Sequence, residues 1–107
     1  MDLAKKKCVP CEGGTKPMGR ADALRNMGFL DGWNFKGNSI SKDMEFKDFN
    51  GAMRFINKLW KIAESEGHHP DIYLHGWNKV RITLSTHAIG GLSINDFILA
   101  AKADRIR

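Results

Sequence analysis

The chain has 107 residues, of which 42% are hydrophobic, and it carries a formal net charge of +5 at pH 7. This length predicts one compact domain with a single core. No apolar run approaches the roughly 20 residues that cross a bilayer, and residues 1–7 lack the apolar stretch of a secretory signal. We therefore expect a cytoplasmic protein that does not bind membranes.

The positive charge lies near the two ends of the chain. Residues 1–20 hold five basic and two acidic groups and residues 102–107 hold three and one, whereas nine Lys and Arg balance nine Asp and Glu between them. Surfaces that bind nucleic acids usually concentrate Lys and Arg on one face of the fold. The distribution therefore argues against a nucleic-acid partner.

The first 19 residues are expected to form an extended leader ahead of a domain over residues 20–107, because they are rich in Gly and Pro and lack apolar periodicity. The leader contains Cys8 and Cys11, which could be half of a zinc site, a redox pair or two reduced thiols. Zinc prefers four ligands and there is no second cysteine pair, so we favour reduced, non-catalytic thiols.

A short helix and a hairpin are expected at the start of the domain. The helix covers residues 20–27 and ends at Gly28, which tolerates a left-handed conformation. Alternating large and polar residues then predict strands over 32–37 and 40–46, joined by a turn at Gly37.

The longest predicted helix runs from a cap at Asp48 to Gly67. Apolar residues recur along it at intervals of three and four, which places them on one face of a helix. We expect this face to lie in the core: Phe49, Met53, Ile56, Trp60 and Ala63.

Two more strands are expected over residues 72–77 and 80–86, with a turn at Asn78 and Lys79. Because side chains alternate along a strand, the apolar face of the second strand excludes His87. That face carries Val80, Ile82, Leu84 and Thr86.

The last predicted helix covers residues 94–104, where Ser93 and Asp96 resemble a capping box. Its core face would consist of Ile94, Phe97, Ile98 and Ala101. The order α-β-β-α-β-β-α predicts a single α+β domain: a four-stranded antiparallel sheet with three helices on one face. The edges of such a sheet are often paired with a second subunit, so we expect a homodimer or homotetramer.

The chain has only four histidines, and three of them fall near carboxylates: His68, His69 and His87, with Glu64 and Asp96. Imidazole exchanges protons near neutral pH, so this group could perform general acid–base catalysis. It could also bind a metal, but adjacent histidines seldom converge on one ion, and we expect no metal. Ordinary structural hydrogen bonding by these side chains is the third possibility.

Five groups of residues together carry a resemblance to a known family. They are Glu64-x-x-x-His68-His69-Pro70, the segment from Trp77 to His87, Gly91-Leu92-Ser93-x-x-Asp96, and the shorter Gly32-Trp33-Asn34 and Phe46–Asn50. In this combination the chain resembles pterin-4a-carbinolamine dehydratases from about residue 20 to its end. The leader around Cys8 and Cys11 is similar to that of the bacterial and plant-type branch.

The resemblance implies an enzyme of tetrahydrobiopterin recycling that removes water from a 4a-hydroxytetrahydropterin to give a quinonoid dihydropterin, without a cofactor. It implies that His68 and His87 are the acid–base pair and that His69 positions the pterin. It further implies supporting carboxylates at Glu64 and Asp96. The implied pocket lining is Gly67, His68, His69, Ser85, Thr86 and His87, with Trp33 as a candidate stacking surface or, equally, a core residue.

The chain departs from animal members of the family at two points. Gly67 replaces an Asp that often precedes the first His, and the segment between Pro70 and Asn78 is one residue longer, which suggests a bulge near Gly76. His75 then has no family counterpart and receives no catalytic role. A non-catalytic role stays open: animal members also stabilise the dimer of a homeodomain transcription factor, and other members could assist further pterin pathways.

Overall fold

The computed structural model describes residues 2–9 and 16–106. Its elements in chain order are the 3-10 helix η1 (Leu3–Lys5), α1 (Arg20–Met27), β1 (Asn34–Phe35), β2 (Ile40–Glu45), α2 (Phe49–Glu66), β3 (Asp71–His75), β4 (Lys79–Leu84), the 3-10 helix η2 (His87–Ile89) and α3 (Ile94–Asp104). No helix in this part of the chain is both long and apolar enough to span a membrane.

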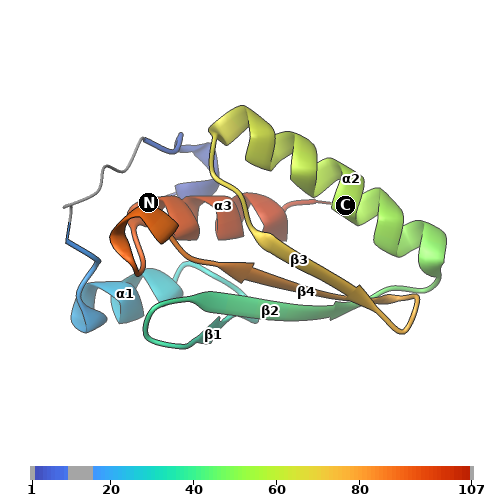
Figure 1. Ribbon diagram of the computed structural model, residues 1–107, viewed down its shortest axis with the longest axis horizontal. Helices are drawn as coiled ribbons and strands as arrows, with labels where there is room; N and C mark the ends of the chain where they lie inside the picture. Colours follow the sequence, from blue (N-terminus) through green and yellow to red (C-terminus); the bar gives the residue numbers. More distant parts are fainter. Residues whose placement is uncertain (1, 10–15, 107) are drawn as a thin grey trace.

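The four strands form one antiparallel sheet in the order β1-β2-β4-β3. The long helices α2 and α3 lie on the same side of this sheet (Figure 1). The predicted α+β class, with three helices and four antiparallel strands, is confirmed. Strand β4 lies between β2 and β3 and is therefore an inner strand of the sheet.

The alternation predicted for the second strand is confirmed in β4. Val80, Ile82 and Leu84 are buried, whereas Arg81 between them is exposed. Thr86 keeps this inward direction beyond the end of the strand and is 4% exposed. The apolar face of β4 thus packs under the helices, and the opposite face is polar.

Helix α2 begins and ends where the sequence predicts. The side chain of Asp48 accepts a hydrogen bond from the Gly51 N–H at 2.7 Å, and Gly67 stops the helix with a left-handed φ of 66°. The predicted core face, however, is wrong at two positions, since Phe49 and Trp60 are 50% and 49% exposed. The residues that are buried are Ala52, Phe55, Leu59 and Ala63. Apolar residues cover more than one face of this helix, so periodicity alone did not identify the face that meets the sheet.

Helix α3 is buried on nearly all sides rather than on one face. Its predicted capping box is present, because the Ser93 hydroxyl accepts a hydrogen bond from the Asn95 N–H and the Asp96 carboxylate accepts one from the Ser93 N–H. The chain start covers the side of α3 that the sheet leaves open. Residues 3–5 of the leader, which was expected to be extended, form η1, and Leu3 is only 2% exposed.

The β3–β4 hairpin differs from its predicted form. Strand β3 ends at His75, and the turn falls at residues 76–78 instead of 78–79. Gly76 and Trp77 have positive φ values of 56° and 62°. Asn78 cannot be the tip of the turn because its side chain is buried and donates to the carbonyl of Phe46 at 2.9 Å.

The first hairpin also differs, since β1 contains only Asn34 and Phe35 where a strand over 32–37 was expected. Gly32 and Gly37, at the ends of that range, both have positive φ values, of 79° and 85°. Such conformations do not fit an extended strand, and the pairing is confined to Asn34 and Phe35 between the two glycines.

Candidate active site

The end of α2 sets the position of the first two histidines. After the left-handed Gly67, the His68 N–H donates back to the carbonyl of Ala63 at 3.2 Å, which satisfies a group at the helix end. This bond turns the chain sharply. The side chain of His68 lies inside the protein with 11% exposed, whereas that of His69 is 64% exposed.

His68 is held by a carboxylate from the start of α3. Its Nε2 atom lies 2.5 Å from Oδ1 of Asp96, whose side chain is fully buried. The other oxygen of Asp96 accepts hydrogen bonds from the Thr86 hydroxyl at 2.9 Å and from the Ser93 N–H at 3.0 Å. A carboxylate can only accept hydrogen bonds, so Asp96 fixes the proton of His68 on Nε2 and leaves Nδ1 for another partner.

His69 has a similar but weaker arrangement at the surface. Its Nε2 atom lies 2.8 Å from Oε1 of Glu64, in the last turn of α2. The Glu64 side chain is 70% exposed, so water competes for this contact. The two neighbouring histidines therefore have unequal environments.

The third histidine follows β4. Thr86 pairs with Gly91 in an isolated bridge, and the chain between them forms η2, which begins at His87. The side chain of His87 is exposed and off the apolar face, as predicted. The Ser85 hydroxyl donates to the carbonyl of Asn38 at 2.9 Å, which fixes the approach to this turn.

These segments enclose one pocket of about 430 Å³. All six residues expected from the resemblance to line a pocket do line it: Gly67, His68, His69, Ser85, Thr86 and His87. Glu64 and Asp96 contact two of the histidines without lining the pocket. Residues more than 15 positions apart in sequence thus meet around a common space.

Trp33 and His75 lie outside this pocket. Trp33 is 8% exposed, and its indole N–H donates to Oδ1 of Asp104 at 2.9 Å, so it is a core residue and does not line the pocket. His75 lies at the end of β3, where its ring stacks on Tyr73 with 4.7 Å between the ring centres. The structure thus supports no stacking role for Trp33.

Five residues that line the pocket were not expected from the sequence: Cys8, Val9, Glu66, Ala88 and Asn95. Cys8 and Val9 belong to the leader, which no periodicity placed against the domain. Burial, and next the charge of Glu66, raise the pKa of the Cys8 thiol from 9.0 to about 12. The thiol therefore stays protonated near neutral pH and is a poor nucleophile. Cys11 lies outside the described residues.

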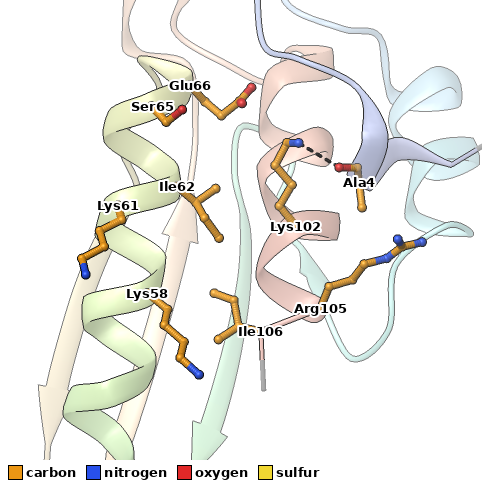
Figure 2. A pocket seen from close by; sticks show the side chains of 9 residues that line it. All are labelled: Ala4, Lys58, Lys61, Ile62, Ser65, Glu66, Lys102, Arg105 and Ile106. Carbon is orange, nitrogen blue, oxygen red and sulfur yellow. Dashed lines mark hydrogen bonds between the residues drawn. The ribbon is translucent and has the colours of Figure 1, made fainter.

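A larger hollow of about 660 Å³ lies between α2 and α3, but no histidine lines it (Figure 2). Ile62 and Ile106 face it from the two sides, and the polar groups around it are mainly Lys and Arg. Within residues 2–9 and 16–106, no three His, Cys, Asp or Glu side chains are placed to hold a metal ion. Of these two pockets, only the smaller one is lined by histidines.

The sequence model of one family, described as pterin 4 alpha carbinolamine dehydratase, matches residues 16–106. A protein of Nitrosospira multiformis named "Putative pterin-4-alpha-carbinolamine dehydratase" is 48% identical over 105 residues, which cover 98% of this chain and 92% of the relative. "Pterin-4-alpha-carbinolamine dehydratase 2, mitochondrial" of Arabidopsis thaliana is 41% identical over 111 residues, covering 99% of this chain and 59% of the relative.

Two solved structures of pterin dehydratase-type proteins are also similar to this chain. A transcriptional coactivator/pterin dehydratase from Brucella melitensis matches with a TM-score of 0.78 and 28% identity, over 83% of this chain and 96% of that one. A pterin dehydratase-like protein described as a RuBisCO assembly factor in the alpha-carboxysome matches with a TM-score of 0.55 and 25% identity, over 67% and 82%. On these similarities in sequence and fold, the chain belongs to the pterin-4a-carbinolamine dehydratase family.

Proposed function

We propose that the protein removes water from a 4a-hydroxytetrahydropterin to give a quinonoid dihydropterin, as a step of tetrahydrobiopterin recycling. The observation that carries this proposal is the convergence of His68, His69 and His87 on one pocket, with His68 fixed by a buried carboxylate. Membership of the family supplies the substrate class. Four other pockets formed by the described residues contain at most one histidine each.

The reaction needs two proton transfers and no net change in oxidation state. The departing hydroxyl takes up a proton as its bond to carbon breaks, and a ring nitrogen loses a proton as the new double bond forms. His68 and His87 line the pocket from different segments of the chain, so one can donate a proton while the other accepts one. Asp96 directs Nδ1 of His68 towards this role by holding Nε2. His69, at the exposed side, contributes to holding the pterin ring.

A second candidate is an interaction role, which one surface of α2 favours. Phe49 and Trp60 are both about half exposed, and the partly buried Met53 and Ile56 lie on the same helical face. Exposed apolar stripes commonly mark contacts between proteins.

We propose that the chain forms a homodimer or homotetramer, and either this stripe or the edge strand β3 is available for the contact. Sedimentation of the purified protein would test this, since a monomer at all concentrations would contradict it.

The dehydratase proposal is tested by adding purified protein to freshly generated 4a-hydroxytetrahydropterin and following the appearance of the quinonoid product. We expect a rate well above that in buffer, both with and without a metal chelator. A rate equal to that in buffer would contradict the enzyme, and recovery of a stable protein complex together with that result would favour the interaction role.

A further inference from the structure

The side chain of Asn95 binds the backbone of the leader on both sides of Val9. The Val9 N–H donates to Oδ1 of Asn95 at 2.9 Å, and Nδ2 of Asn95 donates to the Val9 carbonyl at 2.5 Å. Asn95 is only 3% exposed, although it lies in the first turn of α3. A buried amide with both of its functional groups bound to one backbone residue holds that segment in a defined position.

A second side chain holds the leader next to the contact made by Asn95. The Cys8 N–H donates to Oε1 of Glu66 at 2.7 Å, and Glu66 is the last residue of α2. Further back along the chain, Lys102 of α3 donates to the carbonyl of Ala4 at 2.8 Å (Figure 2). Hydrogen bonds from α3 and from the end of α2 therefore hold the leader in place up to Val9.

The fastened segment ends at the histidine pocket. Cys8, Val9, Glu66 and Asn95 line the same space as His68, His69 and His87. Val9 is 57% exposed, and it adds an apolar side chain to a pocket that is also lined by three histidines. A flat heterocycle bound in the pocket would cover part of this exposed side chain.

From this arrangement we propose that Cys8 and Val9 form a wall of the substrate site that contacts the bound pterin, with Asn95 and Glu66 as the positioning residues that hold the wall in place. The inference rests on the proposed dehydratase function, because it assigns these residues to the same site. It adds the leader to a site that is otherwise built from the end of α2 and the chain after β4.

The direct test is Val9→Trp, with Leu24→Trp on α1 as the matched control, because both residues are exposed and apolar. The indole adds bulk where the pterin lies, so we expect KM for dehydration and Kd for a stable oxidised pterin to change by about threefold or more. The control should change neither value. Equal melting temperatures of the two variants would show that folding is not the cause. Wild-type KM and Kd in Val9→Trp would overturn the proposal.

The positioning role of Glu66 is tested by comparing Glu66→Gln with Glu66→Ala. Glutamine still offers an oxygen to the Cys8 N–H, so it should keep KM near the wild-type value, whereas alanine should raise KM by roughly two- to tenfold, the range expected for loss of one hydrogen bond. Asn95→Ala should raise KM in the same way with kcat less affected. Equal KM values for the two Glu66 variants would contradict the positioning role.

These measurements distinguish a failure of the dehydratase proposal from a failure of the proposed wall. If the wild-type protein does not accelerate dehydration but binds the oxidised pterin, the wall is still tested by the Kd of Val9→Trp. If it accelerates dehydration and Val9→Trp behaves as Leu24→Trp does, only the wall is refuted. If the wild-type protein neither binds the pterin nor accelerates dehydration, both proposals are refuted.

Discussion

The Nε2 atom of His68 lies 2.5 Å from Oδ1 of Asp96, although 28 positions separate the two residues in the chain. The contact joins the end of α2 to the first turn of α3, where Asp96 also closes the capping box. One carboxylate therefore stabilises the start of a helix and orients an imidazole. A buried carboxylate in contact with an imidazole fixes its tautomer, so this pair determines which nitrogen of His68 carries the proton.

Asp96→Asn should lower kcat strongly. The amide NH₂ of the new asparagine can face Nε2 of His68, and Nε2 must then accept a hydrogen bond, so the imidazole proton moves to Nδ1. We therefore expect kcat to fall by about 10²–10⁴-fold, the usual contribution of a general acid or base. Kinetics of the purified variant measure this. Glu64→Gln makes the same change at the exposed partner of His69 and should have a far smaller effect. Similar losses in both variants would contradict a special role for Asp96.

Trp33→Phe separates the core residue from the pterin site. The variant loses the indole hydrogen bond to the Asp104 carboxylate, which should lower the free energy of unfolding by about 1–3 kcal/mol. Because Trp33 does not line the pocket, KM and kcat should stay at wild-type values. Denaturant unfolding and steady-state kinetics measure the two quantities. An increase in KM without loss of stability would place Trp33 at the substrate instead.

Two neighbouring residues of α2 test which face of the helix is buried. Leu59 is 1% exposed, so Leu59→Ala should cost about 2–5 kcal/mol in the free energy of unfolding. Trp60 is 49% exposed, and Trp60→Ala should change that value by less than about 0.5 kcal/mol in the monomer. Urea denaturation of both variants gives the comparison. The reverse order of costs would show that the sequence pattern had identified the correct face.

The raised pKa of Cys8 predicts a specific pH dependence. Because the pKa in the folded protein is about 12 and the usual value is 9.0, the unfolded chain loses the thiol proton first as the pH rises. The free energy of unfolding should therefore decline above pH 9.0, and this part of the decline should be absent in Cys8→Ser. In a Cys11→Ser background, iodoacetamide should alkylate folded Cys8 much more slowly than denatured Cys8 at pH 8. Equal alkylation rates in the two states would contradict the buried thiol.

Much of this site was accessible from the sequence because its key residues lie beside strong local signals. Gly67 ends α2 and so places His68 and His69, while alternation along β4 places Thr86 inward and His87 outward. The capping residue Asp96 was identified by its spacing from Ser93. The family resemblance then related these separate segments to one pocket.

The remaining features depend on tertiary contacts that leave no local pattern. Asn95 and Glu66 bind the leader through its backbone, so the side chains of Cys8 and Val9 carry no signal of that contact. Helix α2 has apolar residues on two adjacent faces, and packing against the sheet selects the one with Phe55 and Leu59. Trp33 matched a motif of the family, but its indole is bound to Asp104 in the core.

The dehydration rates of His68→Ala and His87→Ala test the central claim most directly. If these imidazoles perform the two proton transfers, each variant should stay folded and lose about 10²–10⁴-fold in kcat. His69→Ala should chiefly raise KM, because its proposed role is to hold the pterin. Near-normal kcat in both His68→Ala and His87→Ala would contradict the account.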